Sequence, residues 1–124
     1  MTRLTEAQRA EFDALRQLYE AELPDKLGLI AGAADALRAG GWDKSDLQAF
    51  YMLIHKLTGS AAIYGFDGIS RAAGDLEMWA LAGLTDGVPE PRRVELLPLV
   101  SALQDAFAAG GKSKVRRRAS PPHR

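Results

Sequence analysis

The sequence predicts an all-α protein, an antiparallel up-down four-helix bundle with a short additional N-terminal helix and a disordered basic C-terminal tail. Apolar residues recur at helical spacing in successive segments, and glycine or proline residues separate these segments. No segment shows the strict alternation of apolar and polar residues that a half-buried strand requires. With 124 residues, the chain has room for one core, and we assign residues 1–111 to the bundle and 112–124 to the tail.

For the first half of the domain, the sequence predicts two helices separated at a proline. Thr5 followed by Gln8 is a capping-box pattern, which starts the short first helix. Pro24 lacks a backbone N–H, so we expect a break or kink at Leu23 and a restart at Pro24 or Asp25. The second helix should end at the glycine pair 40–41.

Three further helices are expected in the second half. The third runs from about Lys44 to Tyr64, with Asp43 or Ser45 as its cap, and Gly65 ends it. Asp67 is expected to cap the fourth helix, and residues 85–89 have the composition of a turn. The fifth begins near Pro91 and contains Pro98, which should kink or split it.

Charge and composition exclude several classes of function. Six of the 16 Lys and Arg residues lie beyond Gly111, and all 16 Asp and Glu residues lie before it, so residues 1–111 carry a formal charge of −6. An acidic body disfavours nucleic acid as a partner, while the basic tail is either a solvated terminus or a nonspecific electrostatic contact. The absence of cysteine and the presence of only two histidines disfavour a metal site. No apolar run is long enough for a membrane span and no secretion signal is visible, so we expect a cytoplasmic protein.

The third predicted helix places a histidine on its polar side. At roughly 100° per residue, its apolar residues form one stripe, and His55 lies roughly 120° from the middle of that stripe. Gly59 lies one turn further on and Ala62 follows on the same strip. A glycine inside a helix costs about 1 kcal/mol relative to alanine, so Gly59 indicates either a need for clearance beside the imidazole or, more simply, close packing of helices. The residues of the stripe are Leu47, Phe50, Ile54, Leu57 and Ala61.

The stretch from His55 to Phe66, HKLTGSAAIYGF, resembles the signature of histidine phosphotransfer (Hpt) domains. That signature runs His-x-Leu-Lys-Gly-Ser, then small residues and a glycine that ends the helix. The resemblance spans roughly residues 12–108 and includes Leu76-Glu77 in the next helix. It implies that His55 accepts a phosphoryl group and that Gly59 clears its surroundings. The chain departs from the signature at Thr58, where the family has lysine, so Lys56 would have to supply the positive charge.

The resemblance also implies the partners and the division of labour. A response-regulator receiver domain would supply the aspartate and the Mg²⁺, so this chain would bind no cofactor itself. It would be a monomeric phosphoryl carrier without autokinase activity, working with receiver domains and a hybrid histidine kinase. We predict that the phosphoryl group is supported by Gln48, Lys56, Thr58 and Gly59, and that partners dock on Tyr51, Met52, Ala62 and Ile63.

Two other interpretations remain open at this point. In the first, an Hpt-like adaptor binds a receiver or kinase domain without being phosphorylated, and Thr58 reflects lost chemistry. In the second, an unrelated helical bundle carries the motif by chance, and a buried His55 would support this interpretation. Individual residues also have simpler roles available: ordinary packing for Met52 and Ile63, and a solvated charge for Lys56.

Overall fold

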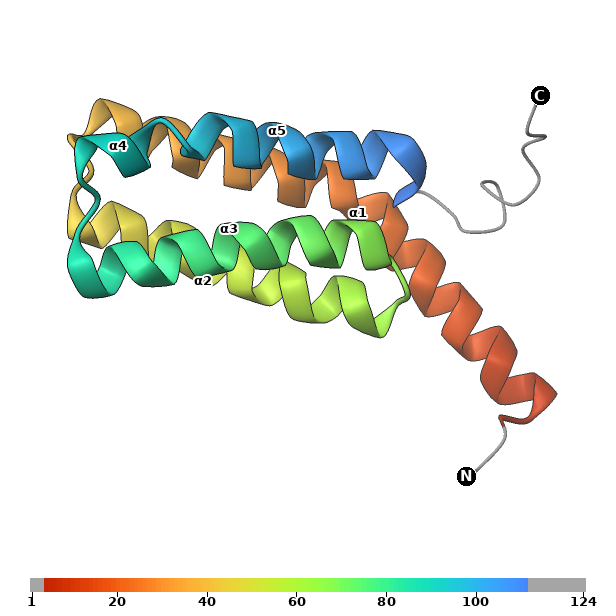
Figure 1. The fold of residues 1–124 in the computed structure, drawn as a ribbon. Coiled ribbons are helices and arrows are strands. Elements are labelled where there is room, and N and C mark those ends of the chain that lie inside the picture. Colours follow the sequence, from red (N-terminus) through yellow and green to blue (C-terminus); the bar gives the residue numbers. More distant parts are fainter. Residues whose placement is uncertain (1–3, 112–124) are drawn as a thin grey trace.

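The structure is a computed structural model that describes residues 4–111. Four long helices lie side by side as a bundle, and a short helix joins the third to the last (Figure 1). No strand occurs between residues 4 and 111, which confirms the predicted all-α class. In chain order the elements are α1 (Glu6–Ala39), α2 (Lys44–Ile63), α3 (Asp67–Asp86), α4 (Glu90–Arg93), α5 (Leu96–Ala106) and a final π-helical turn, η1 (Phe107–Gly111).

The prediction of a separate N-terminal helix is wrong, because α1 is one helix of 34 residues that continues through Pro24. The capping box is confirmed at its start: the Thr5 hydroxyl accepts from the Gln8 backbone N–H at 3.0 Å, and the Gln8 side chain accepts from the Thr5 N–H at 2.9 Å. Proline removes one hydrogen bond from the helix. Buried Leu23 and Leu27 on either side of it hold the helix in register against the core. The N-terminal part of α1 leaves the bundle at an angle (Figure 1).

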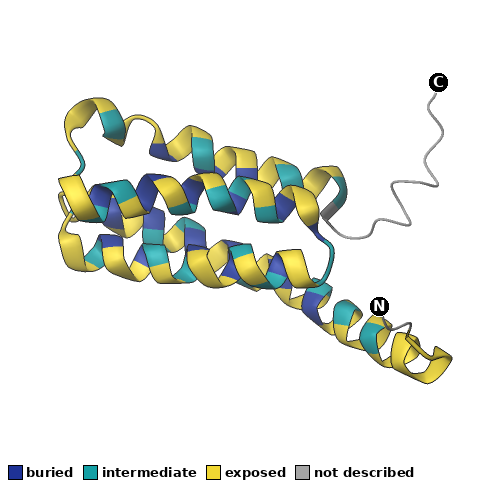
Figure 2. Ribbon diagram, turned by 60° about the horizontal axis from the view of Figure 1, so that its bottom comes forward, coloured by how far each residue is buried: buried dark blue, intermediate teal, exposed yellow. Residues whose placement is uncertain are grey.

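The core lies between the long helices and is built from their apolar faces (Figure 2). The predicted stripe of α2 is confirmed, since Leu47, Phe50, Ile54, Leu57 and Ala61 are all buried. The Phe50 ring meets the Trp79 ring of α3 edge-on, with centroids 6.2 Å apart. The hydroxyls of Tyr19 on α1 and Ser60 on α2 share a hydrogen bond of 2.6 Å. The orientation of α2 is therefore fixed, and with it the face that carries His55.

The two predicted caps of the middle helices have different outcomes. Asp43 takes the N-cap position of α2, as predicted, but its side chain makes no capping hydrogen bond. Asp67 is the first residue of α3 and Phe66 takes the cap position, so the predicted cap is wrong by one residue. Gly65 has a φ of 81°, a left-handed conformation that glycine adopts without strain, and it turns the chain from α2 into α3.

The predicted split of the last helix is confirmed, and Pro98 explains it. The chain breaks at Val94 and Glu95, and α5 begins at Leu96, so Pro98 lies in the first turn, where its missing N–H leaves no bond unmade. Between residues 4 and 111 no helix is long and apolar enough to cross a membrane. The predicted disordered tail, residues 112–124, lies outside the described residues.

Candidate functional site

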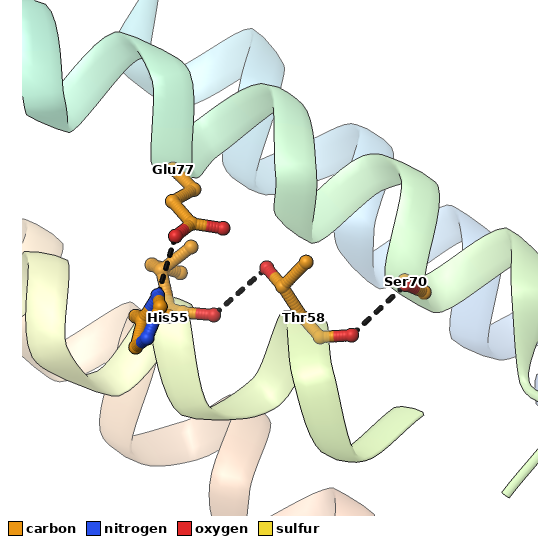
Figure 3. Close-up of polar contacts among 5 residues, drawn as sticks. His55, Thr58, Ser70 and Glu77 are labelled. Carbon is orange, nitrogen blue, oxygen red and sulfur yellow. Dashed lines mark hydrogen bonds and ion pairs between the residues drawn. The ribbon is translucent and has the colours of Figure 1, made fainter. Parts of the chain in front are cut away.

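His55 projects into solvent from the middle of α2, on the side that faces α3 (Figure 3). Its side chain is 57% exposed. The predicted position on the polar side of the helix is thus confirmed, and the buried imidazole that would have supported a chance motif is not found. The neighbouring Ile54 is fully buried and Leu57 nearly so, which anchors α2 on both sides of the histidine.

Glu77 of α3 holds the imidazole from the neighbouring helix. Its Oε2 lies 2.5 Å from His55 Nδ1 (Figure 3). A carboxylate oxygen accepts, so Nδ1 carries the hydrogen, and in the neutral form of the ring the free lone pair would be on Nε2. The Glu77 side chain is 21% exposed. Sequence reasoning missed this role. The only sequence signal for Glu77 was the Leu76-Glu77 pair, which forms part of the family resemblance. That pair does not indicate that the carboxylate reaches His55.

Tyr51, one helical turn before His55, lies flat against the imidazole. The two ring centroids are 5.7 Å apart and the ring planes differ by 20°. Tyr51 is half-buried and packs against the core, so its ring is itself held in place. The residue was predicted as part of a docking surface, and the structure places it beside the His55 ring.

One turn beyond His55, the surface of α2 carries only small residues. A Cβ added to Gly59 would meet no atom within 4 Å, so packing inside this chain does not require a glycine there. Ala62 is exposed on the same side. The simpler explanation, close helix packing at Gly59, is therefore wrong. The open space is available to a molecule approaching from outside.

Exposed apolar side chains surround this part of the surface. Met52 is 45% exposed and Ile63 is 69% exposed, and Gln48 is also exposed. Ordinary packing in the core is thus excluded for Met52 and Ile63. On α3, Leu81 follows Glu77 by one turn and is 44% exposed, although sequence reasoning did not single it out. Apolar side chains from both helices therefore flank the imidazole.

Comparison with known families decides the identity of the fold. A sequence model of the Hpt domain family matches residues 14–110, most of the chain. The chain belongs to the Hpt domain family. Searches among curated proteins and among solved structures found no match. Hpt domains are phosphocarriers, so membership assigns the chain a histidine phosphotransfer role in a phosphorelay.

At position 58 this Hpt domain differs from the family signature, and the structure shows what the threonine does instead. The Thr58 hydroxyl donates to the Ile54 carbonyl at 2.9 Å, and the Thr58 carbonyl accepts from the Ser70 hydroxyl at 2.9 Å (Figure 3). The Thr58 methyl group faces Gly74 of α3. Thr58 thus connects α2 to α3, and its hydroxyl donor is already used. The support of a phosphoryl group by Thr58 therefore stays a prediction, and it would require the hydroxyl to leave the Ile54 carbonyl.

Lys56 is the other predicted source of support, and it lies elsewhere on the Hpt domain. It lines a groove between α1 and α2 together with Lys26, Leu29 and Leu53. Around the helix axis it is displaced by roughly 100° from His55, away from α3. Within residues 4–111, no lysine or arginine forms an ion pair with Glu77. No cluster of three or more metal-ligating side chains occurs among the same residues.

Proposed function

We propose that this Hpt domain carries a phosphoryl group on His55, receiving it from the aspartyl phosphate of one receiver domain and passing it to the aspartate of another. The observation that carries the proposal is the solvent-exposed imidazole whose Nδ1 is hydrogen-bonded to Glu77. This bond directs the free lone pair of Nε2 outward, where a docked receiver would place its phosphorus atom.

The transfer step uses few groups of this chain. The Nε2 lone pair attacks phosphorus in line, the bond from phosphorus to the aspartyl oxygen breaks, and the aspartate leaves as a carboxylate. The ring then bears positive charge, which the Glu77 carboxylate balances through the Nδ1 hydrogen. The second transfer reverses these steps. We assign the Mg²⁺ that neutralises the phosphoryl oxygens to the receiver, and no cofactor to this chain.

The surface around His55 supports a transient docking site for such partners. Met52 and Ile63 on α2 and Leu81 on α3 expose apolar groups, and Gly59 leaves a gap between them. We propose that receiver domains, including that of a hybrid histidine kinase, dock here on a monomeric, cytoplasmic carrier. Lys56 lies outside this surface, so the positive charge on the phosphoryl oxygens would come from the receiver.

The test is phosphotransfer from a panel of phosphorylated receiver domains to the purified chain. Phosphohistidine is labile in acid and stable in base, so the label on this chain should show that stability. One observation favours an adaptor function instead: Thr58 stands where the family signature has a lysine, and its hydroxyl is engaged by the Ile54 carbonyl. An adaptor would bind receivers and remain unlabelled by all of them, and that result would reject the carrier.

Glu77→Gln should slow the transfer without preventing it. Glutamine can still accept the Nδ1 hydrogen through its carbonyl oxygen, but it no longer balances the charge on the phosphorylated ring. Hydrogen bonds to charged groups are about twice as strong as neutral ones, so we expect a loss of about tenfold in the single-turnover rate. Rapid-quench measurements with a phosphorylated receiver give this rate.

The control for this variant is Asp75→Asn, which removes the same charge from an exposed position of α3. It should leave the rate unchanged. Equal losses in both variants would mean that net charge, and not the contact with His55, sets the rate. An unchanged rate in Glu77→Gln would contradict the proposed role of the carboxylate.

A further inference from the structure

Two contacts of different kinds hold the imidazole of His55. Glu77 binds one edge of the ring through Nδ1, and the Tyr51 ring stacks beside it, nearly parallel, with the two centroids 5.7 Å apart. On the other side along the helix, Gly59 offers no side chain, and the space there is open. The imidazole therefore has an aromatic neighbour on one side and open space on the other.

A single hydrogen bond leaves a side chain free to pivot about that bond. An exposed histidine samples several rotamers, and only some of them direct Nε2 away from the protein. A stacked aromatic pair favours the stacked rotamer by about two- to tenfold. Because Tyr51 is half-buried against the core, it supplies a fixed surface for this stacking.

We infer that Tyr51 is a positioning residue for phosphotransfer: it keeps the His55 ring in the rotamer that presents Nε2 to the receiver and leaves the Gly59 side as the path of approach. Its importance for transfer rests on the proposed function of His55. Its effect on the ring is a property of the free chain. Side chains of the docking surface would act differently, by changing the affinity for the receiver.

The experiment compares Tyr51→Phe and Tyr51→Ala in the full chain. Phenylalanine keeps the stacked ring, so its transfer rate at saturating receiver should match the wild type. Alanine removes the ring, and the saturated rate should fall about two- to tenfold while the half-saturating receiver concentration changes little. Leu53→Ala is the matched control: Leu53 is also half-buried on α2 and packs against the core, but it lines the groove toward α1. It should leave the saturated rate unchanged.

Nuclear magnetic resonance of the free chain gives a readout that does not depend on any receiver. In the wild type and in Tyr51→Phe, the His55 ring protons should show ring-current shifts, and the Nδ1 hydrogen should be protected from exchange with water. Both signatures should be lost in Tyr51→Ala and kept in Leu53→Ala.

Two results would overturn the inference. One is an unchanged His55 spectrum in Tyr51→Ala. The other is an unchanged saturated rate with a raised half-saturating concentration, which would make Tyr51 a docking residue. If no receiver labels the wild-type chain, the proposed function fails, and the spectra still decide whether Tyr51 orients the ring.

Discussion

His55→Gln is expected to reduce phosphoryl labelling of the chain to background. Glutamine has no nitrogen with a free lone pair, so no atom at this position can attack phosphorus. The exchange should leave the fold intact, because the histidine side chain is 57% exposed and contributes nothing to the core. Labelling by phosphorylated receivers, with circular dichroism to verify helix content, measures both expectations.

The chain supplies its own control, because His123 is the only other histidine. His123→Gln should be labelled as strongly as the wild type. Label that persists in His55→Gln and disappears in His123→Gln would move the acceptor to the C-terminal segment. That outcome would not affect the membership of the chain in the Hpt family, but it would refute His55 as the phosphoryl acceptor.

Gly59→Leu should separate docking from folding, because it is expected to stabilise the chain and to weaken transfer. Replacing a mid-helix glycine by leucine favours the helix by about 0.5–1 kcal/mol, and a Cβ at this position meets no atom within 4 Å inside the chain. A docked receiver, however, would meet the leucine. Overpacking costs about 1–3 kcal/mol, which corresponds to a rise of about fivefold to 150-fold in the half-saturating receiver concentration.

Gly28→Leu is the matched control for this variant. Gly28 lies in α1, is exposed, and also has no atom within 4 Å of an added Cβ. It should raise the thermal midpoint in the same direction and leave transfer unchanged. If Gly59→Leu binds receivers as well as the wild type does, the partner does not approach over this glycine, and the docking surface must be redrawn.

The sequence predicted the helix that carries His55 with good accuracy, for a clear physical reason. A helix has a fixed angle per residue, so the five apolar positions from Leu47 to Ala61 define its buried face and thereby the exposed position of His55. Pro24 shows the limit of such local rules. The cost of one missing hydrogen bond was expected to end the helix, but Leu23 and Leu27 gain burial by continuing it.

Contacts between helices could not be predicted in the same way. Glu77 lies 22 residues from His55 along the chain, and their meeting depends on how α2 and α3 pack. Thr58 was assigned to the phosphoryl group because of its hydroxyl, yet that hydroxyl bonds to the backbone of its own helix, as threonine often does. Lys56 was assigned by its charge, and only the packing of α1 shows that it lines another groove.

The hydrogen bond from the Ser70 hydroxyl to the Thr58 carbonyl ties α3 to α2 one turn from the histidine. The direction of the His55 ring is therefore set by two helices, and a peptide copied from α2 alone would contain the proposed acceptor without the Glu77 carboxylate that orients it. Transferring the proposed activity to another scaffold would require both helices at their present spacing. A change in the packing between α2 and α3 is expected to shift the His55 imidazole.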